Sequence, residues 1–417
     1  MSEFDNQRWL PPFKAHLIKQ GFKPSTIKRY LSVCQGFLDY LQREGIAVEQ
    51  VNPPILNVYL QLQVQRYRQR HGHLPRDIRT ARHLFDRGIT PLLRFVQGRW
   101  PPSSQPATRL DRFRQRLCND YADWLADSRG LSARTIKTHR CYGLQFLTWL
   151  GNRAAPEHLA ELTIEDIDAY FEAKASCYRR ATRANIAFCL RDFLRYLYTQ
   201  KLIARDLAAA VTSPTVYAME SIPSALKPDD IDTVLDLAKQ NRAPVGIRNY
   251  AILSLLAHYG LRAGEIVQLR LDDIDWRHDH LHIRQSKLHT EAVLPLLTPV
   301  GNALLDYLQN GRPPTAAREV FVRALAPHQP FRTGSSLYGV VARLLTRVGI
   351  QAEGRRGPHT FRHARAVSLL RDAVPLTAVS DILGHRSTAH TRIYLKLATE
   401  DLRDVALDVP APEEVAL

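Results

Sequence analysis

The sequence predicts a multidomain, mainly α-helical protein, in which two small helical domains precede an α+β domain with a small antiparallel sheet. Three observations lead to this prediction. The chain has 417 residues, which exceeds one typical domain. Two stretches in its first half resemble each other, and both have the spacing of amphipathic helices. After Pro228 the helical pattern is interrupted by a short strand-like segment.

The two helical domains are inferred from an internal repeat. Residues 21–41 and 130–150 align without a gap, so that Thr26 and Thr135 lie 109 positions apart. Helix-start signals stand at Ser25-Thr26 in the first copy and at Ser132 in the second. A proline-rich segment, 98–109, separates the copies. We therefore expect a duplicated helical domain, with its first copy at residues 1–105 and its second at 106–215.

The third domain is expected at residues 216–417, after a second linker. The segments "HLHIRQ" (280–285) and "EAVLPL" (291–296) are strand-like and are separated by a polar turn. Amphipathic patterns at 337–349, 361–372 and 376–383 predict helices. This part is therefore expected to combine helices with a small sheet.

The charge of the chain predicts an anionic partner. Lys and Arg number 57 against 41 acidic residues, a net charge of +16. Residues 1–111 hold 17 basic and 8 acidic residues, so the excess is concentrated near the N-terminus. Nucleic acid is the commonest partner for such a protein, and we expect the first helical copy to bind double-stranded DNA. The alternative is that its basic face is merely solvated and that the copy makes protein–protein contacts.

The remaining composition favours a cytoplasmic protein without a membrane partner. The five cysteines form no CxxC pair and none lies at zinc-ligand spacing from a histidine, which fits a reducing compartment. The first residues, "MSEFDNQRWLPPF", do not resemble a signal segment, and no run of eighteen apolar residues occurs.

Two motifs in the last half combine arginine with residues that could orient it. In "YGLRAGEIVQL", Arg262 and Glu265 are three apart, so they are expected on one face of a helix. A guanidinium fork suits phosphate oxygens, and a carboxylate can hold it in place. In "GPHTFRHARA", His359, Arg362 and His363 are expected on one face of the first helical turns. Each motif by itself is also typical of an ordinary helix surface.

A third motif, "LGHRSTAHTRIY", offers a nucleophile. Gly384 can end the preceding helix, and His385 follows at once. The hydroxyl of Tyr394 is a poor nucleophile alone, because its pKa is about 10. Nearby cations would favour its ionised form.

Taken in order, Arg262, Lys287, the HxxR pair, His385 and Tyr394 resemble the tyrosine recombinase (phage integrase) family, over residues 222–410. The second helical copy resembles the core-binding domain that precedes the catalytic domain in this family. The tail "YLKLATEDLRDVAL" resembles that of transposon-type members. The additional first copy departs from the minimal family plan.

The resemblance implies a specific chemistry. Tyr394 would attack a DNA phosphate, form a 3′-phosphotyrosyl link and free a 5′-hydroxyl, so that no cofactor, metal or ATP is needed. Arg262 and Arg362 would hold the non-bridging oxygens. Lys287 would be the acid for the leaving oxygen, although His289 in the same turn is an alternative.

The resemblance also assigns the remaining residues. His385 would donate to the same phosphate, and His359 would be a base or a phosphate contact. Glu265 would support Arg262, and His363 would be a structural histidine beside the site.

The implied protein is a site-specific recombinase or transposase of a bacterial mobile element, acting at the nucleoid. It would assemble as a tetramer on DNA, with other recombinases of the same element as candidate partners. The alternatives are a relaxing enzyme of the type IB topoisomerase kind and a catalytically silent DNA-binding regulator.

Overall fold

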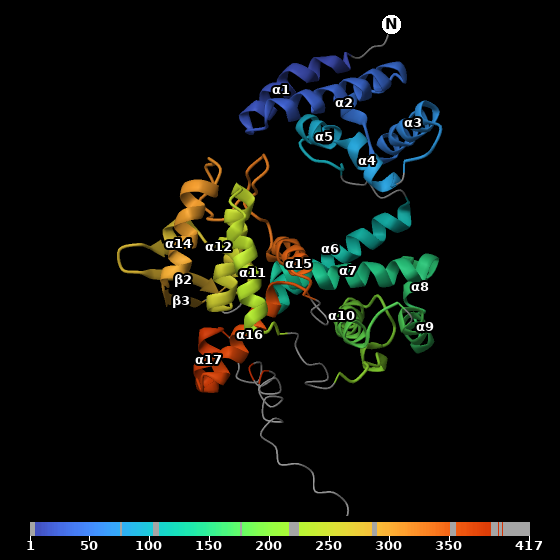
Figure 1. Ribbon diagram of the computed structural model, residues 1–417. Helices are drawn as coiled ribbons and strands as arrows, with labels where there is room; N and C mark the ends of the chain where they lie inside the picture. The colour runs from blue at the N-terminus through green and yellow to red at the C-terminus, as the bar shows by residue number, and fades with distance from the viewer. Residues whose placement is uncertain are drawn as a thin grey trace, which may run out of the picture. The chain divides into compact units, whose positions relative to one another are not determined.

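The computed structural model describes residues 5–75, 77–102, 108–175, 177–216, 225–285, 290–350 and 356–384, together with Thr391 and Tyr394. The chain divides into two compact units, one formed by residues 1–96 with 221–417 and the other by residues 97–220. Figure 1 labels their helices and strands in chain order. As predicted, the fold is mainly helical with a small antiparallel sheet.

The N-terminal region consists of helices, with a short 3₁₀ turn at each of two places. The α-helices are α1 (Leu10–Lys19), α2 (Pro24–Arg43), α3 (Pro53–His71), α4 (Ile78–Asp86) and α5 (Ile89–Gln97). Their core is aromatic: Phe13 of α1 packs on Phe95 of α5, and Phe37 of α2 packs on Tyr59 of α3. The helix predicted in the first copy exists. It begins at Pro24, before the expected Ser25, because proline is well suited to the first helical position.

The second unit repeats this use of amphipathic helices. It contains α6 (Arg109–Arg129), α7 (Ala133–Leu150), α8 (Pro156–Leu159), α9 (Ile164–Ala175) and α10 (Arg180–Thr199). Ser132 caps α7 as predicted, since its hydroxyl accepts the backbone N–H of Thr135 at 3.3 Å. Tyr121, Phe146, Tyr170 and Phe193 are fully buried in its core.

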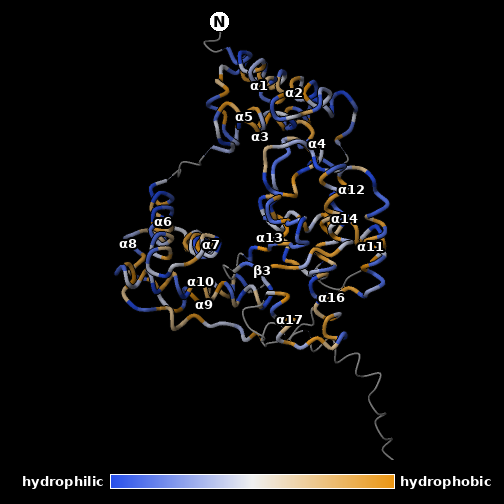
Figure 2. Tube along the Cα trace, turned by 90° about the vertical axis from the view of Figure 1, so that its left-hand side faces the viewer, coloured by the Kyte–Doolittle hydropathy of each residue, from blue (hydrophilic) through white to orange (hydrophobic). Residues whose placement is uncertain are grey.

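The C-terminal region surrounds one central helix. Its helices are α11 (Pro228–Gln240), α12 (Pro244–Tyr259), α13 (Ala263–Gln268), α14 (Thr298–Asp306), α15 (Tyr338–Arg347), α16 (Pro358–Arg371) and α17 (Leu376–Ile382). Residues 251–256 of α12 are all buried, because α11, α14 and α16 pack around this helix. The mixture of apolar and polar turns along the surrounding helices is visible in orange and blue in Figure 2.

The sheet has the order β1-β2-β3 and is antiparallel throughout. The strands are β1 (Ile274–Asp275), β2 (His280–Gln285) and β3 (Thr290–Pro295), and Ile283 pairs with Ala292. The two longer strands confirm the prediction. Strand β1 was not predicted, because two residues are too few to show an alternating pattern.

None of the helices in the described part of the chain is both long enough and apolar enough to span a membrane.

Candidate active site

Arg262 is held by both oxygens of one buried carboxylate. It lies at the N-cap of α13, whereas the sequence had predicted a position within a helix. Its backbone N–H donates to Glu265 Oε2 at 2.8 Å, and its Nη1 donates to Glu265 Oε1 at 2.8 Å. The carboxylate therefore folds back from the third helical position, as in a capping box, and orients the guanidinium at the same time.

Arg362, in the second turn of α16, is buried, and it donates hydrogen bonds to the backbone of two turns that are distant in the sequence. Its Nη1 donates to the carbonyl oxygen of Gly260 at 2.9 Å, and its Nη2 donates to that of Leu383. Burial lowers the pKa of Arg362 to about 10, and the positive charge of Arg262 acts in the same direction. The side chain is still a cation at neutral pH, so two guanidinium charges lie close together here.

Tyr394 lies on a small apolar cluster formed by α16 and α17. Its side chain is only 3% exposed. Its hydroxyl lies 3.1 Å from Nδ1 of His363. Burial raises the pKa of Tyr394, whereas the charge of Arg362, a hydrogen bond from that guanidinium and the charge of Arg262 oppose this rise. At neutral pH the hydroxyl keeps its proton, and it lies among one imidazole and two cations.

The two histidines of the HxxRH sequence occupy different environments. The side chain of His359 is exposed, whereas that of His363 is partly buried, and their rings stack with centroids 6.3 Å apart. Burial lowers the pKa of His363 to about 4, and the neighbouring His359 and Arg362 contribute. His363 is therefore neutral at pH 7. Its contact with the tyrosine hydroxyl was not predicted from the sequence.

Lys287, His289 and His385 fall outside the described residues, but the described ends of their segments lie together. Strand β2 ends at Gln285, just before Lys287, and Gly384 directly precedes His385. A Cβ on Gly384 would lie 2.4 Å from Gln285 Oε1, so the side chain of Gln285 would have to shift if any larger residue stood at position 384. The φ angle of +59° at Gly384 confirms that it ends α17.

The carbonyl oxygen of Gly384 accepts a hydrogen bond from Nη2 of Arg262. The turn after α17 is thus held by Arg362 through Leu383 and by Arg262 through the next residue. The structure brings together Arg262, Glu265, Arg362, His363 and Tyr394, with His359 on the exposed side of α16.

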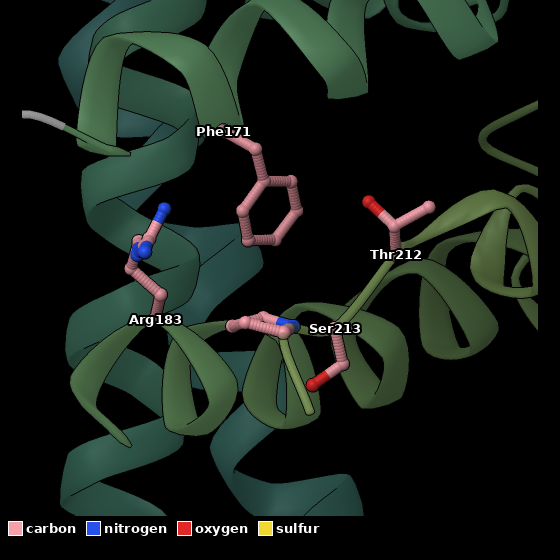
Figure 3. Close-up of a pocket in the computed structure, with 5 residues that line it drawn as sticks. Phe171, Arg183, Thr212 and Ser213 are labelled. Carbon is pink, nitrogen blue, oxygen red and sulfur yellow. The ribbon is translucent and has the colours of Figure 1, made fainter. Parts of the chain in front are cut away.

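Two cavities lie elsewhere. One of about 270 Å³ is lined by Phe171 of α9, Arg183 of α10 and the segment 212–214 (Figure 3). Among the described residues, its lining offers an arginine and two hydroxyl groups but no acid or base side chain for catalysis. Another of about 400 Å³ is lined by residues of α11, α12 and α16, including Ile231, Leu235 and Val367. Within the described ranges, no three His, Cys, Asp or Glu side chains are grouped so that they could hold a metal ion.

Comparison with known proteins identifies the family of this chain. The model of the phage integrase family matches residues 224–401. The putative integrase/recombinase y4rA of Sinorhizobium fredii is 32% identical over 96% of this chain and 94% of its own length. Tyrosine recombinase XerD of Mycobacterium tuberculosis is 31% identical over 68% of this chain and 94% of its own length.

A solved structure shares the fold. The XerH site-specific recombinase, bound to a palindromic difH substrate in a post-cleavage complex, aligns with a TM-score of 0.55 at 18% identity, over 73% of this chain and 90% of its own. The relationship to y4rA extends over nearly the whole of both chains, and the family model covers the region that contains the arginine–histidine–tyrosine cluster. The chain is therefore an enzyme of the phage integrase family, the tyrosine recombinases.

Proposed function

We propose that this enzyme cuts and rejoins DNA at specific sites through a 3′-phosphotyrosyl intermediate on Tyr394. The observation that carries the proposal is the position of the Tyr394 hydroxyl, which lies within hydrogen-bond distance of a neutral imidazole and next to two arginines. Tyrosine becomes a useful nucleophile only where a base and nearby cations favour loss of its proton. This cluster supplies both.

The two arginines suit the transition state of phosphate transfer. As the Tyr394 oxygen forms its bond to phosphorus, negative charge grows on the two non-bridging oxygens and the bond to the 5′-oxygen breaks. A guanidinium has five N–H donors, and the contacts of Arg262 and Arg362 with the described residues use only some of them. The others are available to the phosphate, and their fixed orientation removes the need to reorganise during the reaction.

The leaving 5′-oxygen must be protonated, and we assign this step to Lys287, with His289 as the alternative. His385 would donate to a non-bridging oxygen. Gln285 and Gly384 lie close together, which supports this assignment. Gln285 precedes the segment that contains Lys287, and Gly384 precedes the segment that contains His385. His359, exposed on α16, would contact the phosphate or act as a base. The energy of the broken bond stays in the phosphotyrosyl ester, so rejoining needs no ATP.

The biological substrate is proposed to be the end of a mobile element, with double-stranded DNA as partner. Exchange between two duplexes requires four strand cuts. Each chain provides one Tyr394, so four chains would act together on the paired sites. Both helical regions are proposed to bind the duplex, and the concentration of basic residues near the N-terminus supports this for the first.

The test is formation of a covalent adduct with candidate element-end DNA. A nick near the cleavage site lets the short 5′-hydroxyl fragment leave, so the intermediate accumulates and is seen on a denaturing gel. Tyr394→Phe should abolish the adduct and still bind DNA. Tyr338→Phe, at a tyrosine that is 49% exposed on α15, serves as the matched control and should keep the adduct. An adduct with the Tyr394→Phe variant would refute the assignment.

The same assay separates the alternatives. A regulator without catalytic activity would give no adduct with the unmodified chain. An enzyme of the type IB topoisomerase kind would relax supercoiled plasmids that lack the element ends, whereas a site-specific recombinase requires those ends.

A further inference from the structure

We infer that His363 is itself a catalytic residue, whose Nδ1 takes the proton from the Tyr394 hydroxyl during attack and returns it during rejoining. The inference rests on the proposed function and adds to it. From the sequence, this histidine was expected only to support the site. Its distance of 3.1 Å from the hydroxyl instead places it in contact with the reacting atom.

The position of the imidazole is well defined by its surroundings. His363 follows Arg362 on α16, a helix whose next turns pack on α12 and α17. Its ring lies between the stacked ring of His359 and the ring of Tyr394, whose centroid is 5.4 Å away. The tyrosine is buried on Ala366, Leu369 and Val379, so both partners of this hydrogen bond are held by packing. A proton acceptor with a fixed orientation is what general base catalysis requires.

The protonation state also suits the role. Burial lowers the pKa of His363, so the ring is neutral and Nδ1 can accept a hydrogen bond from the hydroxyl. Without substrate, burial, the neighbouring His359 and the charge of Arg362, which lies close to Arg262, oppose proton uptake by this ring. A bound phosphodiester brings a negative charge beside these arginines, which makes protonation of the imidazole easier. The base therefore gains strength when the substrate is in place.

The step balances without any further reactant. The O–H bond of Tyr394 breaks and its proton moves to Nδ1, while the tyrosine oxygen forms a bond to phosphorus. The bond from phosphorus to the 5′-oxygen breaks, and that oxygen is protonated by a different group. In rejoining, the 5′-hydroxyl attacks phosphorus, the tyrosine oxygen leaves, and the imidazolium returns the proton to it.

The decisive variant is His363→Asn, assayed in the full chain by single-turnover cleavage of the nicked duplex. An asparagine amide can still accept a hydrogen bond near the Nδ1 position, but it cannot take up a proton at neutral pH. We expect cleavage to slow by about 10²–10⁴-fold, the usual contribution of a positioned base. DNA binding should be unchanged. The control is His278→Asn, at an exposed histidine after β1, which should cleave at the unmodified rate.

A second substrate distinguishes base from acid. Sulfur in place of the bridging 5′-oxygen gives a leaving group that needs no protonation. His363→Asn should stay slow on this substrate, because its defect concerns the nucleophile, whereas Lys287→Ala should recover. Recovery of His363→Asn on the sulfur substrate, or a rate within about threefold of the unmodified enzyme on normal DNA, would overturn the inference.

Rescue provides an independent test should the asparagine variant fold poorly. In His363→Ala, added imidazole should restore adduct formation in proportion to its concentration, and absence of rescue in a variant that binds DNA normally would count against the base. If the unmodified chain itself forms no adduct, the proposed function fails. If it forms the adduct and His363→Asn does so at the same rate, only the inference fails.

Discussion

Glu265→Gln should weaken both the stability of the catalytic region and the rate of cleavage. The two carboxylate oxygens each accept a hydrogen bond of 2.8 Å, one from the backbone N–H of Arg262 and one from its guanidinium. Glutamine has the same shape but only one acceptor, so one of these donors must face an amide NH₂ group. The substitution also removes the one negative charge that the described contacts place beside Arg262 and Arg362.

The magnitude follows from these contacts. A hydrogen bond to a charged group contributes about 1.5–3 kcal/mol, and breaking a buried ion pair costs about 3–5 kcal/mol. The Arg262 side chain is 19% exposed, so water partly replaces the missing partner. The cost should therefore lie nearer to that of the hydrogen bond than to that of the fully buried ion pair. We expect unfolding to become easier by about 2–3 kcal/mol. If misplacement of Arg262 also raises the activation free energy of cleavage by about half of this amount, cleavage slows about tenfold.

The assay is urea denaturation combined with single-turnover cleavage of the nicked duplex. Glu291→Gln is the matched control, because this exposed residue of β3 lies outside the arginine cluster, and it should change neither quantity. A loss of less than about 0.5 kcal/mol with an unchanged rate, which is the size of an ordinary surface substitution, would refute the role assigned to Glu265.

Other parts of the chain lead to further predictions. Arg362→Lys keeps the charge but loses the fork, so cleavage should fall by about 10²–10³-fold while filter binding to DNA changes little; an equal loss of both would make Arg362 an ordinary phosphate ligand. Burial holds the pKa of His139 below its ordinary value of 6.5, so the folded second unit excludes a proton that the unfolded chain accepts. The contribution of neutral His139 to the free energy of unfolding is therefore complete above pH 6.5 and is lost as the pH falls below that value. His139→Gln should reduce the difference in stability between denaturation experiments at pH 7.5 and pH 5.5. Replacing the exposed Lys23, Lys28 and Arg29 by glutamine should make the slope of log affinity against log salt shallower by about 0.9 for each DNA phosphate that is no longer neutralised. An unchanged slope would favour the protein–protein role of the first helical copy.

The sequence predicted the features that depend on local spacing. The helix containing Arg362 and His363, the glycine that ends α17 and the two longer strands follow from short-range patterns, and all are present. Arg262 was placed wrongly within a helix, because a spacing of three also occurs between an N-cap residue and the third helical position. Glu265, which provides the glutamate of a capping box at the start of an apolar run, is the signal that could have indicated this.

The contacts that assemble the site could not be predicted. Arg362 donates to the carbonyl groups of Gly260 and Leu383. Every residue has a backbone carbonyl, so the sequence does not indicate which of them will accept a hydrogen bond. The contact of His363 with Tyr394 depends on how the chain returns after α17, which local patterns do not specify. Lys287 and His385 remain predictions.

The two arginine hydrogen bonds that hold the turn at Leu383 and Gly384 have a consequence for a chain that is still being synthesised. Arg262 is separated by 122 residues from Gly384, and Arg362 by 21 from Leu383. When the first arginine leaves the ribosome, its carbonyl partner does not yet exist, and the tyrosine follows later still. Domains fold as units from the N-terminus during synthesis, so the helical regions can form before the arginine–tyrosine cluster is complete. The order of residues along the chain thus delays completion of the catalytic cluster until after the helical regions have been synthesised.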